Sequence, residues 1–263
     1  MKRQLHTALA RGLALLAAAA FIIATFGEAT ARAETFVGSN VDSRVIVAFQ
    51  VNADAAQSWL PKGWNLTPLA KGPSAGANLL VVFFDKHLAR DSDGNPTTPS
   101  SYRGAALVSL ASQAGSDEIR LYVTRIYATP LEYDPYSNAI HAGISRSATH
   151  KAVDNSAPVR TEEWTVKPEG GGEMILKLSY EAGIPTWSKG EVMPYSNTKP
   201  DFHRIYRYEQ LADLVMSVPA DKSLGGETTF TSTIPELAPM FDGSEKMISV
   251  IAIPVYVRQV FLP

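Results

Sequence analysis

A polar segment in the middle of the chain, residues 138–154 (NAIHAGISRSATHKAVD), gathers side chains that could do chemistry. It holds His141, Arg146, His150 and a lone lysine, Lys151. A lysine in an apolar pocket loses its proton more readily, and the free amine can then attack a ketone or an aldehyde. Most lysines are solvated surface groups, so an ordinary surface lysine in a loop is the alternative interpretation.

Other catalytic signatures are incomplete or missing. Residues 143–147, Gly-Ile-Ser-Arg-Ser, lack the final glycine of the turn that carries the serine of many hydrolases. The sequence has no H-E-x-x-H motif and no cysteine, which excludes disulfides, thiolate metal sites and a cysteine nucleophile. The run Asp91-x-Asp93-x-Asn95 begins like a calcium loop, but Pro96 stands where that loop requires glycine. The sequence therefore predicts neither a metal nor a cofactor.

The elements that must position Lys151 are mostly strands. Runs rich in valine, isoleucine, leucine and aromatic residues alternate with polar positions, as in strands with one buried face. These runs cover residues 43–51, 77–84, 104–112, 118–128, 162–167, 174–180 and 247–262. Three consecutive glycines at 170–172 predict a hairpin between two of the strands.

Helical signals are few. Residues 53–60 predict one short helix that ends before Pro61, and residues 208–215 favour either a second short helix or part of a pair of strands. No internal repeat or linker divides the chain. We therefore expect a single, mainly β (α+β) domain, with the sheet closed or folded over itself and a few helices outside it.

The N-terminal residues predict a segment that is removed. Basic residues in the first eleven positions precede an apolar run, residues 13–26, and then the small-residue pattern Ala-Arg-Ala at 31–33, typical of a bacterial signal peptide. The apolar run is shorter than the ~20 residues of a membrane span. We expect cleavage of residues 1–33 and a mature domain of residues 34–263. That domain should be periplasmic or secreted, with no stable membrane insertion after cleavage; an uncleaved anchor is the alternative.

The expected mature chain is mildly acidic. Removing residues 1–33 takes four basic and one acidic residue from totals of 24 and 26, which leaves a net charge of −5. An acidic protein has no electrostatic means of holding a polyphosphate backbone, so we expect no nucleic-acid partner. The expected partner is a small-molecule ligand or substrate, and assembly into a homo-oligomer stays open.

The order of these segments resembles the acetoacetate decarboxylase family. In that family a stretch reading roughly A-I-x-x-G-R-E-x-x-x-x-P-K-K carries a Schiff-base lysine after the glycine. Here Ala139-Ile140-His141-Ala142-Gly143 is followed by Lys151 at the same spacing. Family-like segments stand in the same order along nearly all of residues 34–263: SRVIVAFQVNADAAQSWLPKGW, ANLLVVFFDKH, IRLYVTRIYATPLEYDPYSNAI, KPDFHRIYRY and KMISVIAIPVYVRQVFLP.

The resemblance implies an acetoacetate decarboxylase-like domain, a closed β barrel or cone with a few short peripheral helices. It also implies that Lys151 forms a Schiff base with a small keto compound, as in a lyase of the decarboxylase, aldolase or dehydratase type. A family arginine near the first strand corresponds to Arg44. The other candidate substrate-binding residues, chosen by sequence proximity or strand position, are Arg146, His150, His141 and Tyr180.

The sequence departs from the family pattern around the lysine. Residues 144–145, Ile-Ser, replace the Arg-Glu pair, His150 replaces the proline, and Ala152 replaces the second lysine. The second lysine matters because a like charge lowers the pKa of its neighbour. The acids of the decarboxylase pocket fall near Leu79 and Gly104, which transfer no protons.

Three functions therefore remain open. The first is a lyase that acts on a small keto compound through Lys151, which the family-like spacing from Gly143 favours. The second is a non-catalytic periplasmic binding protein that uses the same pocket for a hydrophobic or carbonyl-bearing small molecule, which fits the missing acids and the signal peptide. The third is an envelope protein without a pocket, which a solvent-facing Lys151 would favour.

Overall fold

A computed structural model describes residues 33–263, except 117, 130–133 and 155–156. Residues Glu34–Pro263 form one compact unit, and the expected signal peptide lies outside the described residues apart from Ala33. The elements, in chain order, are β1 (Thr35–Gln50), α1 (Ala53–Gln57), β2 (Asn65–Leu66), β3 (Leu79–Arg90), β4 (Tyr102–Ser112), β5 (Arg120–Ala128), β6 (Ala139–Lys151), β7 (Val159–Pro168), β8 (Met174–Glu181), β9 (Thr186–Val192), β10 (Pro194–Ser196), β11 (Ile205–Ser217), β12 (Glu227–Ser232), the 3₁₀ helix η1 (Pro235–Leu237) and β13 (Lys246–Leu262).

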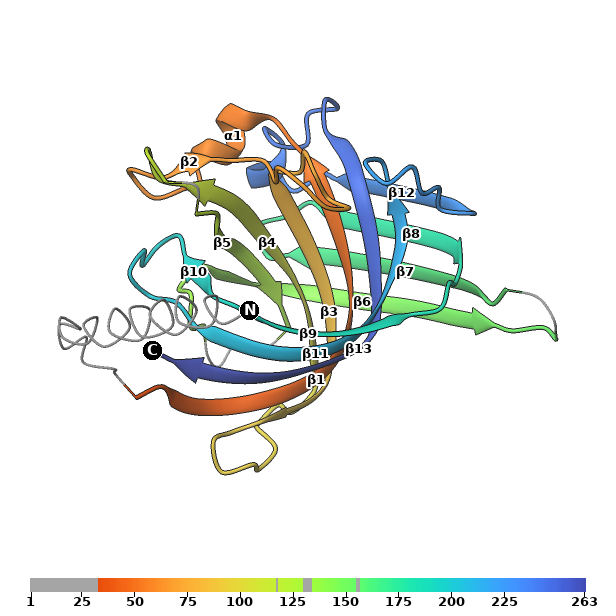
Figure 1. Cartoon of the computed structure of the whole chain (residues 1–263), viewed down its shortest axis with the longest axis horizontal. Helices are drawn as coiled ribbons and strands as arrows, with labels where there is room; N and C mark the ends of the chain where they lie inside the picture. The colour runs from red at the N-terminus through yellow and green to blue at the C-terminus, as the bar shows by residue number, and fades with distance from the viewer. Residues whose placement is uncertain (1–32, 117, 130–133, 155–156) are drawn as a thin grey trace, which may run out of the picture. The chain divides into compact units, whose positions relative to one another are not determined.

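The described strands form one mixed, strongly curved sheet of 13 strands (Figure 1). Its main order is β12-β8-β7-β6-β5-β4-β3-β1-β13-β11-β9, antiparallel throughout except for the parallel pair of β5 and β6. Strand β2 pairs with β4, and the short strand β10 runs parallel to β5. The pairing of β1 with β13 places the first and the last strand of the chain side by side in this sheet.

The expected closed barrel or cone is wrong. Strands β12 and β9 end the sheet order, and no ladder among the described strands joins them. The chain that leaves β9 continues as β10, which pairs with β5 over three residues only, while β6 occupies the other end of that edge of β5. The edge of β5 is thus divided between two strands, and the sheet curls without closing.

The helices are fewer than expected. Helix α1 forms where predicted and begins at a cap in which the side chain of Asn52 accepts a hydrogen bond from the backbone N–H of Ala55 (3.1 Å). Residues 208–215 belong to β11, which pairs with β13 on one side and β9 on the other. These ladders hold the segment extended, since they satisfy its backbone groups on both sides. None of the helices in the described part of the chain is long and apolar enough to cross a membrane.

The polar segment around Lys151 is a strand, not a loop. Strand β6 pairs with β7 along its length, from Ala142 opposite Pro168 to Lys151 opposite Val159. The triple glycine connects β7 to β8 as a hairpin, as predicted, with positive φ at Gly171 and Gly172.

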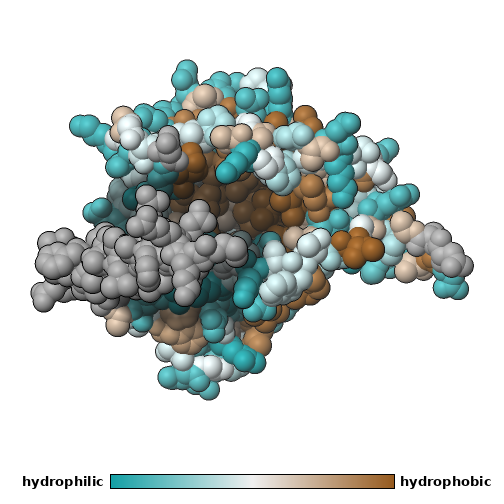
Figure 2. Space-filling model, in the orientation of Figure 1, coloured by the Kyte–Doolittle hydropathy of each residue, from teal (hydrophilic) through white to brown (hydrophobic). Residues whose placement is uncertain are grey.

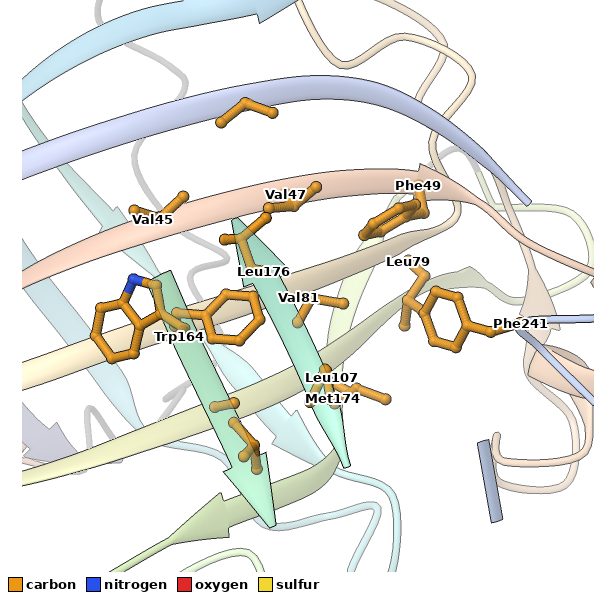
Figure 3. Close-up of a cluster of buried hydrophobic side chains, with 14 of the residues drawn as sticks. Val45, Val47, Phe49, Leu79, Val81, Leu107, Trp164, Met174, Leu176 and Phe241 are labelled. Atoms are coloured by element: carbon orange, nitrogen blue, oxygen red, sulfur yellow. The ribbon is translucent and has the colours of Figure 1, made fainter. Parts of the chain in front are cut away.

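The hydrophobic core lies between β1, β3 and β4 on one side and β7 and β8 on the other (Figure 3). Trp164 of β7 is fully buried there, with its ring 5.6 Å from that of Phe83 of β3. Only one face of β1, β3 and β4 packs into this core. The side chains on the other face of these strands lie outside this core and can line a separate site.

Candidate active site

A cavity of about 380 Å³ lies on that second face of the sheet. Residues of β1, β3, β4, β5, β11 and β13 form most of its lining, and β6, β9, β10 and the segments with Asp134, Pro135, Tyr136 and Arg204 complete it. Its walls are largely aliphatic and aromatic, and Figure 2 shows a hollow with a hydrophobic floor on one side of the molecule. A concave, mostly apolar cavity with a few converging polar groups is the usual form of a small-molecule site.

Strand β3 shows how the sequence builds the cavity wall. Leu80, Val82, Phe84 and Lys86 line the cavity, whereas the residues between them, within Leu79–Phe83, are buried in the core. Successive side chains of a strand point to opposite faces, so a continuous apolar run serves both environments. Lys86 is the first charged residue on the cavity side of this strand.

Lys86 belongs to a row of polar side chains that crosses four strands. The strand register places Lys86 opposite Tyr102 of β4 and opposite Asp42 of β1. Asp42 in turn lies opposite Tyr256 of β13. These residues are distant in sequence, and only the pairing of β4, β3, β1 and β13 brings them together.

The amine of Lys86 lies among aromatic rings. Its Nζ is hydrogen-bonded to the Tyr102 hydroxyl and lies 4.3 Å from the centroid of the Tyr102 ring and 5.8 Å from that of Phe84. Burial lowers the pKa of Lys86 well below its ordinary value, and the nearby charge of Arg258 lowers it further, while Asp42 opposes the shift. The amine of Lys86 therefore gives up its proton more readily than a lysine in water does.

Tyr102 is suited to exchange a proton with that amine. Burial raises the pKa of its phenol, so the hydroxyl stays protonated at neutral pH. A protonated phenol next to a free amine can donate a proton to an oxygen atom that is bound at the same place.

Asp42 holds the side chains of Arg44 and Asn40 in position. Its side chain is fully buried and accepts two hydrogen bonds from Arg44 (2.8 and 2.7 Å) and one from Asn40 (2.7 Å). The Arg44 guanidinium also lies over the Tyr256 ring, 3.4 Å from its centroid. Arg44 is thus fixed by a carboxylate and an aromatic face, an arrangement for which its planar group is well suited.

Arg258 projects into the cavity next to this network. Its Nε donates to the side-chain oxygen of Asn40 (2.8 Å), and its guanidinium lies 4.0 Å from the centroid of the Tyr206 ring. Burial opposes its charge, but Tyr206, Tyr256 and Asp42 outweigh that effect and raise the pKa of Arg258. This arginine stays charged in an apolar setting.

Lys151 and His150, the centre of the predicted site, lie elsewhere. Both are exposed at the end of β6, and neither lines the cavity. The distal half of β6 is exposed from Ser147 onward, so this strand leaves the compact part of the domain before it reaches the lysine. A catalytic role of Lys151 stays a prediction, and its position provides no apolar surroundings.

The other predicted residues are spread over three environments. His141 is exposed and pairs with Glu169 (2.7 Å), and Tyr180 is buried in the hydrophobic core. Arg146 forms ion pairs with Asp85 of β3 (3.2 Å) and Glu162 of β7 (3.1 Å), outside the large cavity. Of the six predicted residues, Arg44 alone lines the large cavity.

The sequence contains a signal for Lys86. In the run LLVVFFDKH, Lys86 follows Leu80, Val82 and Phe84 at intervals of two, which places it on the same face as three apolar residues. The spacing from Gly143 favours Lys151 instead.

Comparisons with solved structures identify the fold. The enduracididine biosynthesis enzyme MppR with HEPES bound aligns with a TM-score of 0.57 and 12% identity, over 87% of this chain and 86% of that chain. An acetoacetate decarboxylase-like enzyme from Sphingomonas wittichii RW1 aligns with a TM-score of 0.52 and 10% identity, over 86% and 90%. This chain has the acetoacetate decarboxylase-like fold. No protein-family model matches its sequence, and no curated protein does.

The family resemblance predicted from segment order is thus confirmed at the level of fold. At this low identity the acetoacetate decarboxylase-like fold transfers no catalytic residue by alignment. The described residues of the domain hold no cluster of three or more His, Asp or Glu side chains suited to a metal ion.

Proposed function

We propose that this protein is a Schiff-base-forming lyase of the acetoacetate decarboxylase-like type, with Lys86 as its nucleophile. One observation carries the proposal: a lysine amine in an apolar cavity, beside Arg44 and Arg258, whose pKa is lowered by burial and like charge. Lysines that lie in cavities and have a strongly shifted pKa are characteristic of catalytic sites.

The proposed first step uses Lys86 and Tyr102. The uncharged Nζ attacks the carbonyl carbon of the substrate, and the Tyr102 hydroxyl protonates the oxygen that develops. The Tyr102 phenolate then takes a proton from the attached nitrogen and passes it to the same oxygen, which leaves as water; an iminium ion on Lys86 and the phenolate of Tyr102 remain. The iminium withdraws electrons from the adjacent carbon and so weakens the bond to a carboxylate attached there.

The carboxylates of the site favour decarboxylation over reactions that need a carboxylate base. Asp42 is engaged by Arg44 and Asn40, and Asp134 accepts backbone hydrogen bonds from Tyr136 (3.1 Å) and Ala139 (2.7 Å). Among the described residues around the cavity, neither acid is free to remove a proton from carbon. Loss of CO₂ needs only the electron sink that the iminium supplies.

Proteins of the same fold support a keto acid as substrate. MppR is recorded in complex with pyruvate, at a TM-score of 0.56 to this chain, and with a condensation product of pyruvate and imidazole 4-carboxaldehyde, at a TM-score of 0.53. We infer that the cavity of this chain also takes a carbonyl compound.

Borohydride trapping tests the proposal. Residues 34–263 are incubated with a panel of keto acids, ketones and aldehydes, reduced, digested and analysed by peptide mass spectrometry. The expected result is one stable adduct on Lys86, with no adduct in Lys86→Met and unchanged labelling in Lys151→Met, a matched change at an exposed lysine.

Two results would contradict this assignment. Labelling of Lys151 in place of Lys86 would return the reaction to the lysine that the family spacing predicts. Saturable binding of carbonyl compounds without any adduct on the wild-type protein would identify a binding protein that uses the cavity without chemistry.

A further inference from the structure

We propose that a second, small cavity of this protein, at the edge of the hydrophobic core, binds a phosphate ion. At ~30 Å³ per water molecule, its volume of about 200 Å³ equals roughly six or seven waters, which leaves room for one phosphate ion. Its lining comes from β1, β3, β6, β7 and β13, and Arg44 and Ile253 border both cavities. The proposal does not depend on the reactivity of Lys86.

The small cavity lies where the hydrophobic core gives way to charged side chains. On the core side of β7, Trp164 is buried, while Glu162 and Arg160, at the same interval of two, line the small cavity. On β3 the same alternation leads from Phe83, in the core, to His87, at the small cavity. Polar groups of two distant strands therefore face the same space.

Two of the three arginines that line the small cavity are neutralised by carboxylates. Arg44 forms an ion pair with Asp42 (2.7 Å). Arg146 forms ion pairs with Asp85 (3.2 Å) and Glu162 (3.1 Å). Glu162 is the one carboxylate among the described lining residues. The third arginine therefore decides the balance of charge in the small cavity.

That third arginine, Arg160, forms no ion pair with any described carboxylate, and its Nε is buried without a described acceptor. Tyr180 lies opposite Arg160 on β8, and its buried hydroxyl also forms no hydrogen bond of normal geometry with a described residue. A partly buried guanidinium without a counter-charge costs free energy. An anion bound next to Arg160 would supply that charge.

Hydrogen-bond donors from three strands face the small cavity. Ser43 of β1 is buried, and its Oγ accepts a hydrogen bond from Arg146 (2.8 Å), which leaves its own hydroxyl proton to donate. Arg160 of β7 adds guanidinium N–H groups, and His87 of β3 adds a ring N–H. A tetrahedral anion, with oxygens in four directions, suits donors from several strands better than a planar carboxylate does.

Glu162 favours phosphate over sulfate. The hydrogen bonds that its carboxylate accepts from Arg146 and Trp164 all go to Oε2, so Oε1 stays available as an acceptor among the described residues. Monohydrogen phosphate carries an O–H that can donate to this oxygen. Sulfate has no proton at neutral pH and would meet only a like charge.

Calorimetric titration at constant ionic strength tests the proposal. The wild-type protein is titrated near neutral pH with phosphate, sulfate and acetate, and the melting temperature is measured in the same solutions. Phosphate should bind saturably and raise the melting temperature, with a dissociation constant roughly tenfold or more below those of sulfate and acetate.

Variants assign the binding to residues. Arg160→Gln should raise the dissociation constant of phosphate roughly tenfold or more, and Arg160→Lys should restore part of the affinity. Ser43→Ala, which removes a single donor, should raise it roughly severalfold. Arg207→Gln, at an exposed arginine of β11 that lines neither cavity, is the matched control and should leave phosphate binding unchanged.

The outcomes decide the proposal separately from the Schiff-base chemistry, because no carbonyl compound is used. Absence of saturable phosphate binding, or equal binding by the wild-type and Arg160→Gln proteins, would overturn the site. Equal affinity for phosphate and sulfate would overturn the assignment of the ion. Should Arg160→Gln fail to fold, the comparison of wild-type, Arg160→Lys and Ser43→Ala proteins gives the same decision.

Discussion

At the scale of single residues, the lowered pKa of Lys86 has a cost in stability. Its pKa is lowered in the folded protein, so between that value and about 10.5 the unfolded chain holds a proton that the folded chain lacks. Unfolding then takes up a proton, and the free energy of unfolding rises with pH across this interval. The penalty is greatest at and below the lowered pKa and disappears above 10.5.

Replacing Lys86 by methionine should therefore stabilise the protein at neutral pH. Methionine keeps an unbranched side chain of similar length in the apolar cavity and carries no charge to desolvate. We expect a higher melting temperature at pH 7, by roughly 2–4 °C for each kcal/mol gained, and a smaller gain at pH 10.

Thermal unfolding of the wild-type and Lys86→Met proteins at both pH values measures this effect. Lys151→Met, at an exposed position, should leave the melting temperature nearly unchanged. A loss of stability in Lys86→Met that is as large at pH 7 as at pH 10 would show that the amine is held in its charged form.

At the scale of elements, the contact between β3 and β4 shapes the cavity. Phe84 and Gly104 lie directly opposite each other, and a Cβ at position 104 would overlap the Phe84 ring. The ring also packs edge-on against Tyr102, at a centroid distance of 6.2 Å. A glycine in β4 thus allows an aromatic ring to lie flat on the sheet beside Lys86.

Gly104→Ala should displace the Phe84 ring into the cavity. The expected result is a loss of about 1–3 kcal/mol in the free energy of unfolding from overpacking, together with weaker labelling of Lys86 by bulky carbonyl compounds. Urea unfolding and the trapping assay measure the two effects.

Gly143→Ala is the matched control for this change. A Cβ at position 143 of β6 would lie 3.9 Å from its nearest neighbour, the backbone oxygen of Lys167, so it is accommodated without displacement. Equal behaviour of the two alanine variants would mean that Phe84 moves aside without cost.

A second contact between elements explains why Arg146 does not belong to the cavity. Arg146 of β6 binds Ser43 of β1 (2.8 Å), Asp85 of β3 and Glu162 of β7, and it lies 4.9 Å from the centroid of the Trp164 ring. These partners come from both parts of the bent sheet. Its position therefore fits a structural tie between β6–β7 and β1–β3 better than a substrate-binding role.

At the scale of the whole molecule, one sheet contributes to both the hydrophobic core and the cavity. One face of β1 and β3 carries Val45, Val47 and Leu79 into the hydrophobic core, and the other face lines the cavity. The sheet stays open, yet its curvature places β11 and β13 across from β4 and β5. The cavity is therefore a product of sheet curvature and needs no barrel closure.

We also propose that the domain is exported, as the N-terminal pattern predicts. Expression of the full chain in a bacterium should yield periplasmic protein that begins at Glu34, as intact-mass measurement and N-terminal sequencing would show. Ala33→Asp should block cleavage. Recovery of full-length protein from the cytoplasm in both cases would contradict export.

The sequence by itself determined the predominance of strands, helix α1, the glycine hairpin and the family order along residues 34–263. These features depend on local periodicity, on turn residues and on the order of segments, all of which can be read along one chain. The open sheet depended instead on how β5 shares its edge between β6 and β10, which no local pattern encodes.

Only the tertiary structure shows that Lys86 lies in the cavity and that Lys151 is exposed. Spacing from Gly143 favoured Lys151, but reactivity depends on burial and on neighbouring charges, and these come from β1, β4 and β13 in register. Asp42, Lys86, Tyr102 and Arg258 have no relation in sequence that would predict their meeting. The pKa of a lysine is a property of its three-dimensional surroundings, so no pattern along the chain could predict that the pKa of Lys86 is lowered.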